Sequence, residues 1–214
     1  MFKKLFILIV VILLSTMMNN SMEAKPYSVA ILIYEGVYLL DFAGPLEIFN
    51  DAMENDTNPA FSVFLVSPDG NPVKAHTGTA ITPQFSINNS PQPDVLVIPG
   101  GDLGLAGKNK ELASWIIKTS DKSLITLSVC TGAFILADLG LLDGKEATTW
   151  YGAKKRLQSK YPKIHVVDKR FTDNGKIITT AGVSAGIDGA LHVVERLFGK
   201  ATAEKTAKYI EWER

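Results

Sequence analysis

The sequence predicts an α/β protein in which a mostly parallel sheet lies between two layers of helices. Three observations lead to this fold class. Apolar runs alternate with segments of helical periodicity along the chain from residue 26 onward. The apolar runs are nearly continuous, which is typical of strands buried on both faces of a parallel sheet. One such run ends directly at the only cysteine, Cys130, and a helical pattern follows it.

The chain up to residue 129 is expected to contain four strands, a small hairpin and two helices. Pro45 is placed in the first turn of the first helix, where its missing N–H has no intrahelical partner to lose. Thr77 and Gly78 supply the turn of the hairpin. The predicted strands are 27–34, 61–66, 95–98 and 124–129, the hairpin is 73–81, and the helices are 42–53 and 110–118.

The remainder of the chain continues the same alternation. A turn is expected at Asp143, and Gly199 is expected to end the longest helix as its C-cap. Residues 25–214 are sufficient for one well-buried domain. The predicted helices are 131–139, 151–159, 184–198 and a short one from about residue 202, and the strands are 147–149, 165–167 and 176–180.

Residues 1–24 are typical of a signal peptide. Lys3 and Lys4 precede an unbroken apolar run of ten residues, 5–14, which is short for a membrane span. Ala24 is the best cleavage residue, although Met22 stands where a small residue is preferred. We therefore expect export to the periplasm or outside the cell, with no stable membrane association after cleavage. The alternative is an uncleaved N-terminal membrane anchor.

Composition excludes several classes of function. Lys plus Arg and Asp plus Glu each total 22, so the net charge is zero, and no basic stripe suggests a nucleic-acid partner. The three histidines are scattered without a ligand partner at zinc-like spacing, so we expect no metal site. A single cysteine cannot form an internal disulfide.

Cys130 is the main candidate for a catalytic residue. It stands where a buried strand ends and a helix begins, as in a nucleophile elbow with cysteine in place of serine. The unpaired N–H groups of a helix N-terminus favour the thiolate, which is the reactive form. The alternative interpretation is structural, because free cysteine often behaves as a small buried apolar residue.

Two other loops are expected to meet the loop of Cys130 at the carboxyl edge of the sheet. Asp41 stands at the start of the first helix as an N-terminal cap or first-turn acid, as a general acid/base facing the thiol, or in both roles. Gly100 and Gly101 follow a strand and could turn N–H groups inward as an oxyanion hole together with the N–H of Thr131. On their own, the two glycines indicate no more than a tight turn.

Three further side chains are candidates for lining a pocket. Trp150 and Tyr151 follow a predicted strand, where aromatic residues more often belong to the core. Glu47 is a possible second carboxyl near the thiol, although one turn further along the helix it is expected to pack or to form an ion pair.

Five segments of this chain resemble the ThiJ/PfpI family of the class I glutamine-amidotransferase-like superfamily. The similarity covers residues 26–208 in order and is most specific around the cysteine. It implies a flavodoxin-like three-layer sandwich. The segments are DFAGPLE at 41–47, DVLVIPGG at 94–101, SVCTGAFILA at 128–137, GLLDGKEATT at 140–149 and TAGVSAGID at 180–188.

The most similar branch is that of isonitrile hydratase and the amidase-like domains of AraC-type regulators, in which threonine follows the cysteine. The resemblance assigns catalysis to Asp41, Cys130 and Thr131, with no cofactor, a small-molecule substrate and a homodimeric assembly. The regulators' helix-turn-helix half finds no counterpart here, so no nucleic-acid binding is expected. In this branch Thr-Thr is commonly followed by His-Trp, but here Trp150 and Tyr151 follow Thr149.

The resulting hypothesis is a cysteine-dependent hydratase or hydrolase for a small carbon–nitrogen substrate. Cys130 would attack the substrate, and Asp41 would transfer protons. One alternative is a non-enzymatic redox or stress protein with an oxidisable Cys130. The resemblance also leaves open a glyoxalase-type activity, as in other branches.

Overall fold

A seven-stranded sheet forms the centre of the part of the chain that the computed structural model describes, residues 25–101 and 109–213. Its strand order is β10-β11-β7-β6-β1-β2-β5, and only β10 runs antiparallel to its neighbour. The strands are β1 (Tyr27–Leu32), β2 (Phe61–Ser67), β5 (Phe85–Ser86), β6 (Val95–Ile98), β7 (Ile125–Ser128), β10 (Phe171–Asp173) and β11 (Ile177–Thr180).

The central strands are buried on both faces. Every residue of β6, β7 and β11 is buried, as are the last four of β1. Such strands need a layer of helices on each side, because neither face tolerates water. Their uninterrupted apolar sequences are therefore the signal that identified them as parallel strands.

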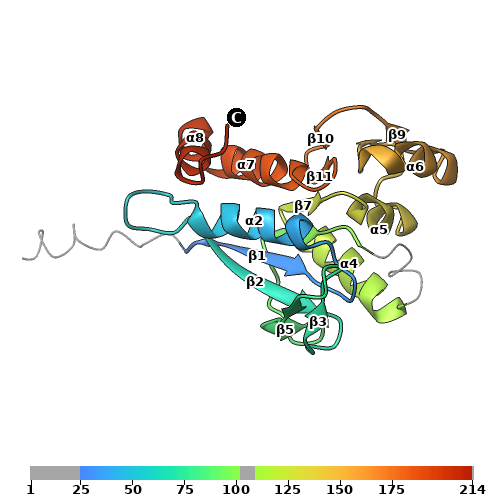
Figure 1. Ribbon diagram of the computed structural model, residues 1–214, viewed down its shortest axis with the longest axis horizontal. Helices are drawn as coiled ribbons and strands as arrows, with labels where there is room; N and C mark the ends of the chain where they lie inside the picture. Colours follow the sequence, from blue (N-terminus) through green and yellow to red (C-terminus); the bar gives the residue numbers. More distant parts are fainter. Residues whose placement is uncertain (1–24, 102–108, 214) are drawn as a thin grey trace, which may run out of the picture.

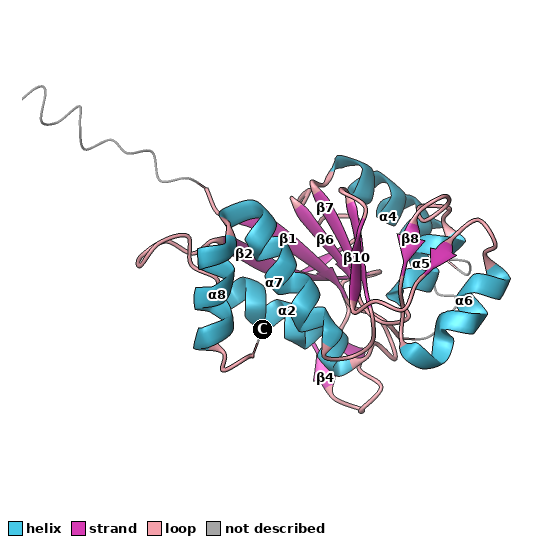
Figure 2. Cartoon of the chain, turned by 90° about the horizontal axis from the view of Figure 1, so that it is seen from above, coloured by secondary structure: helices cyan, strands magenta, loops and turns pink. Residues whose placement is uncertain are grey.

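Helices cover both faces of the sheet, as the two views show (Figures 1 and 2). One layer contains α2 (Leu39–Asp51), α7 (Ala185–Phe198) and α8 (Lys200–Tyr209), which pack on one another. The other contains α4 (Lys110–Lys122) and α5 (Gly132–Asp138), with α5 against β6 and β7. The three-layer, flavodoxin-like sandwich expected from the sequence is confirmed.

Shorter elements lie outside the main sheet. The strands β3 (Val73–Lys74) and β4 (Ala80–Ile81) form the expected antiparallel hairpin. A second pair, β8 (Glu146–Ala147) and β9 (His165–Val166), is parallel. Between them come the 3₁₀ turn η1 (Tyr151–Ala153) and α6 (Lys154–Lys160), where the sequence predicted one continuous helix.

Helix boundaries account for most differences from the sequence-based prediction. Helix α2 begins at Leu39 rather than at residue 42, so Pro45 lies in its second turn and Asp41 in its first. Proline there leaves the carbonyl of Asp41 without its intrahelical donor. Helix α4 continues to Lys122, and Gly199, with φ of +87°, ends α7 as predicted.

The strands that the prediction missed are β5 and β10, two and three residues long at the two edges of the sheet. Edge strands this short carry little apolar periodicity. The predicted signal segment, 1–24, lies outside the described residues. Within the described part of the chain, no helix has both the length and the apolar character needed to cross a membrane.

Candidate functional site

Four loops meet at the carboxyl edge of the sheet. They follow β1, β6, β7 and β11, which are neighbours in the order β11-β7-β6-β1 and run parallel. The chain changes direction across the sheet between β1 and β6, and open α/β sheets bind ligands at such a switch point. The loops bring together Asp41, Gly100, Cys130 and Val183.

Cys130 occupies a strained turn between β7 and α5. Its φ is +57°, in the left-handed region that non-glycine residues rarely adopt. Its N–H donates to the carbonyl of Ala181 over 2.9 Å, and its carbonyl accepts from Thr149 Oγ1 over 2.7 Å. Two neighbouring segments therefore hold the elbow in place. The turn also requires Gly132, since a Cβ there would lie 2.1 Å from the carbonyl oxygen of Ile98.

Asp41 lies fully buried beside the thiol. Its Oδ2 accepts from the N–H of Gly100 over 3.1 Å. Gly100 permits this approach because a Cβ would lie 2.6 Å from the same oxygen. Asp41 Oδ1 has no hydrogen-bond partner of standard geometry among the described residues. Longer contacts with the Cys130 thiol and the N–H of Val183 accompany this buried carboxyl.

The two side chains strongly affect each other's protonation. Burial raises the pKa of Asp41 to about 6, although contact with Cys130 and the N–H of Gly100 oppose this. Burial and the charge of Asp41 raise the pKa of Cys130 to about 12, although the N–H of Thr131 opposes this. At neutral pH, the pair therefore carries one proton on sulfur and one negative charge on the carboxylate.

The N–H of Thr131 favours the thiolate as expected, but burial and the charge of Asp41 outweigh it, so the net pKa shift of the thiol is upward. Helix α5 has only seven residues. Asp41 lies in the first turn of α2, which is one of the two helix-start positions expected for it, and Tyr38 is the N-terminal cap.

The inward N–H groups predicted for Gly100 and Gly101 already donate hydrogen bonds to other residues of the protein. The N–H of Gly100 donates to Asp41, and that of Gly101 donates to Thr131 Oγ1 over 3.1 Å. The same hydroxyl donates weakly to the carbonyl of Gly101 over 3.4 Å. The glycine pair therefore orients Asp41 and Thr131, rather than offering an open oxyanion hole.

Val183 is one of two site residues that the sequence-based reasoning missed, the other being Tyr38. Val183 occupies the turn between β11 and α7 with φ of +57°, and its N–H favours the charged forms of both Asp41 and Cys130. The available signal was the sequence Ala181-Gly-Val-Ser at a third strand-to-helix junction on the same sheet edge.

A cavity of about 260 Å³ opens over the sulfur. Trp150 is 38% exposed and contributes to the wall, as predicted from the sequence. Tyr151 packs against Trp150 with a ring distance of 4.9 Å but is 77% exposed and lies outside the lining. The described residues that line the cavity are Tyr38, Gly101, Cys130, Thr131, Trp150 and Val183.

Glu47 does not belong to this cavity. It lies on the exposed face of α2, and the described residues offer it no ion pair. The first turn of α2 faces the sulfur, so a residue six positions beyond Asp41 projects elsewhere. No group of three or more His, Cys, Asp or Glu in the described residues could hold a metal ion.

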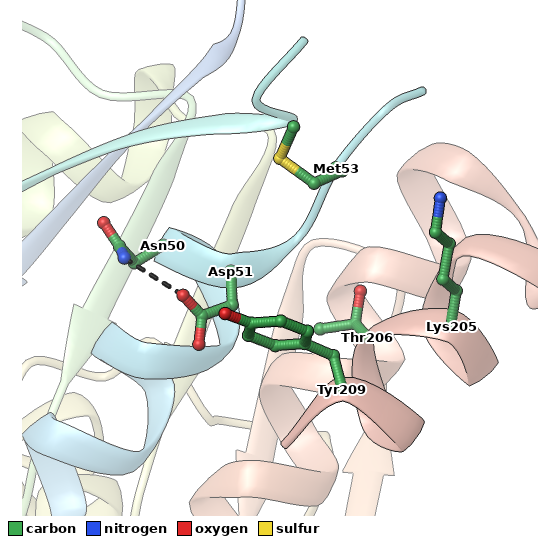
Figure 3. Close-up of a pocket in the computed structure, with 6 residues that line it drawn as sticks. All are labelled: Asn50, Asp51, Met53, Lys205, Thr206 and Tyr209. Atoms are coloured by element: carbon green, nitrogen blue, oxygen red, sulfur yellow. Dashed lines mark hydrogen bonds between the residues drawn. The ribbon is translucent and has the colours of Figure 1, made fainter. Parts of the chain in front are cut away.

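A second cavity, of about 330 Å³, lies at the other end of α2 (Figure 3). It begins at Asn50, nine residues beyond Asp41 and so about 13 Å along the helix. Its ionic groups already have partners: Asp51 accepts from Asn50 over 3.1 Å, and Lys205 pairs with Asp56 over 2.6 Å. Its lining comprises Asn50, Asp51, Met53, Lys205, Thr206 and Tyr209.

The fold and the site define an α/β protein with a buried cysteine at a strand-to-helix elbow and a carboxyl beside it. The chain belongs to the DJ-1/PfpI family, whose model matches residues 27–196. It is 31% identical to an isonitrile hydratase of Pseudomonas putida over 86% of this chain and 78% of that protein.

Other relatives of this chain carry names that indicate other roles. An uncharacterised protein of Streptomyces lividans is 34% identical over 66% of this chain and 99% of its own length. Further relatives are named as HTH-type transcriptional regulators and DJ-1 proteins. Among solved structures, a ThiJ/PfpI family protein from Pseudomonas syringae has a TM-score of 0.79 and 28% identity, covering 92% of this chain and 79% of its own.

Proposed function

We propose that this protein is a cysteine-dependent hydratase that adds water to a small carbon–nitrogen substrate, an isonitrile in the first instance. The observation that carries the proposal is the buried carboxyl of Asp41 in contact with the Cys130 thiol, which lines a small cavity. The similarity to an isonitrile hydratase supports the choice of substrate.

The first step requires Asp41 to act as a base, because the resting thiol is protonated. Asp41 takes the thiol proton while Sγ attacks the terminal carbon of the isonitrile. The proton then passes from Asp41 to that carbon, giving a thioimidate, R–N=CH–S–Cys130. A raised carboxyl pKa of about 6 suits both transfers near neutral pH.

Water completes the reaction. Asp41 removes a proton from water as the oxygen adds to the thioimidate carbon, and it passes that proton to the nitrogen. The C–S bond then breaks, the sulfur regains its proton, and R–NH–CHO leaves. The sum is R–NC plus H₂O giving an N-substituted formamide, with Cys130 and Asp41 restored.

Backbone groups stabilise the charge that develops on sulfur during both steps. The N–H groups of Thr131 and Val183 already favour the thiolate over the thiol. They act as fixed dipoles in a water-poor site, where such interactions are strongest. The N–H of Gly101 donates to the hydroxyl of Thr131. This contact orients Thr131 and therefore its backbone N–H.

A redox or stress role for Cys130 is the second candidate. Oxidation by peroxide follows thiolate character, so a thiol pKa of about 12 argues against a sensor in the resting state. A glyoxalase-type activity would use the same nucleophile, so 2-oxoaldehydes belong in the substrate screen. The proposal further includes export of the chain, with or without retention of residues 1–24, and assembly as a homodimer.

The direct test is product analysis. Purified protein is incubated with n-butyl isonitrile, simple amides and methylglyoxal, and products are followed by NMR. We expect N-butylformamide from the wild type and none from Cys130→Ala. Glu47→Gln is the matched control, because it removes an exposed carboxyl from the same helix as Asp41. Absence of turnover of both the isonitrile and the amides would overturn the proposed function, and turnover of methylglyoxal alone would favour the glyoxalase-type activity.

A further inference from the structure

The indole of Trp150 is held between two glycines from different segments. A Cβ on Gly152, in η1, would lie 2.5 Å from Cζ3 of the indole. A Cβ on Gly182, between β11 and α7, would lie 2.5 Å from Cδ1. Real Cβ atoms do not approach a ring carbon this closely, so the position of the indole depends on glycine at both sites.

Two of the described residues that line the cavity beside this ring are aromatic, counting Trp150 itself, and none has a cationic side chain. Tyr38 forms a second wall, and its own ring stacks on His76 at a centroid distance of 4.1 Å. Val183 adds an aliphatic surface. None of the described lining residues carries a cationic group, while the buried Asp41 carboxylate lies beside Cys130. The described side chains that line the cavity therefore offer no cation to pair with an anion.

We propose that Trp150 is a specificity-determining residue that selects uncharged substrates with a flat aromatic group next to the reacting carbon–nitrogen unit. The held indole offers its exposed part as a stacking surface, and the substrate's reactive end then reaches Sγ of Cys130. This inference deepens the proposed function and rests on it for the reacting group. The aromatic preference itself belongs to the cavity and is measurable without turnover.

Thiol alkylation provides that measurement. The probes are N-benzyl-2-chloroacetamide, its N-cyclohexylmethyl analogue of similar size, unsubstituted 2-chloroacetamide and chloroacetate. We expect Cys130 of the wild type to react with the benzyl reagent about tenfold faster than with the cyclohexylmethyl reagent, because aromatic rings gain from stacking beyond their buried area. Chloroacetate is expected to react most slowly, because its charge is unpaired beside Asp41.

Variants identify the ring responsible. In Trp150→Ala the benzyl-to-cyclohexylmethyl rate ratio is expected to fall to about one. Trp150→Phe is expected to restore most of the ratio. Gly182→Ala keeps the tryptophan but displaces its ring and is expected to lower the ratio as well. Trp115→Phe, on α4 with its indole bonded to Ser90, is the control that keeps the wild-type ratio.

The outcomes separate this inference from the proposed function. Equal rates for the two bulky reagents, or an unchanged ratio in Trp150→Ala, overturn the inference even if isonitriles are hydrated. A Trp150-dependent ratio supports it even if no isonitrile is turned over, and the function alone then fails. If both hold, benzyl isonitrile is expected to have a KM about tenfold below that of cyclohexylmethyl isonitrile.

Discussion

Two neighbouring strand-to-helix junctions of this sheet share one unusual backbone conformation. Cys130, between β7 and α5, and Val183, between β11 and α7, both have φ of +57°. The strands are paired in parallel, and the N–H of Cys130 donates to the carbonyl of Ala181. Cys130 is buried and carries the nucleophile, whereas Val183 is 40% exposed and contributes only its backbone N–H and an aliphatic surface.

The comparison separates strain from chemistry. Both junctions store backbone strain, so strain alone does not make a nucleophile. The difference is the environment of the side chain: Cys130 faces the buried Asp41, while the side chain of Val183 borders the cavity. The site therefore depends on a proton shared between the thiol of Cys130 and the carboxyl of Asp41. Both junctions position this pair, but only the junction at Cys130 carries a reactive side chain.

Removing Asp41 is expected to have the largest effect. Asp41→Asn keeps the shape of the side chain but cannot take the thiol proton, so turnover should fall by about 10²- to 10⁴-fold. Steady-state formation of the formamide measures the effect. Glu47→Gln should leave the rate within twofold of the wild type. A similar loss in both variants would show that the effect is not specific to the carboxyl beside the thiol.

The two junctions differ in the residue that each needs two positions beyond its strained residue. Cys130 is followed by Gly132, against which β6 packs, whereas Val183 is followed by Ala185. Gly132→Ala should lower the free energy of unfolding by about 3 kcal/mol or more, because its Cβ meets backbone that cannot move aside. Ala185→Gly is the matched control, with an expected loss of about 1 kcal/mol. Chemical denaturation compares them, and equal losses would contradict the difference between the junctions.

The Asp41 carboxyl should also give stability a specific dependence on pH. Its pKa is raised from 3.8 to about 6 in the folded protein, so the folded state binds the proton more tightly. Stability from this group is present below pH 4 and is lost as pH rises through 6, by at most about 3 kcal/mol. Asp41→Asn should lack this loss and be more stable than the wild type at pH 7. Identical pH profiles for the two proteins would contradict the raised pKa.

The smallest expected effect comes from relaxing the junction at Val183. Val183→Gly should relieve the strain of a β-branched residue at positive φ and raise stability by about 1 kcal/mol. Val183→Ala is the control, since it removes the branch and keeps a Cβ. Thermal unfolding of both variants measures the gain. A loss of stability in Val183→Gly would mean that packing of the valine outweighs its backbone strain.

Much of this architecture could be predicted from the sequence. The apolar strands β1, β6 and β7 predicted a parallel sheet, and the carboxyl-edge rule then brought Asp41, Gly100 and Cys130 together. The start of α2 was misplaced because Pro45 was taken as a first-turn proline, although the structure accommodates it one turn later.

Other features depend on three-dimensional burial and could not be predicted from residue order. The thiol pKa is set by desolvation and by the nearby Asp41 charge, which outweigh the helix-start effect that the sequence suggested. The role of Val183 depends on a backbone angle that nothing in a valine side chain indicates.

The most direct test of the shared proton is the pKa of Cys130 in the wild type and in Asp41→Asn, measured by alkylation with 2-chloroacetamide across pH. The wild type should show little thiolate up to about pH 10, and the variant should titrate at clearly lower pH, because the charge that opposes ionisation is gone. The variant should thus alkylate faster at pH 8 while hydrating isonitriles more slowly. Equal thiol pKa values in the two proteins would contradict the coupled Cys130–Asp41 site.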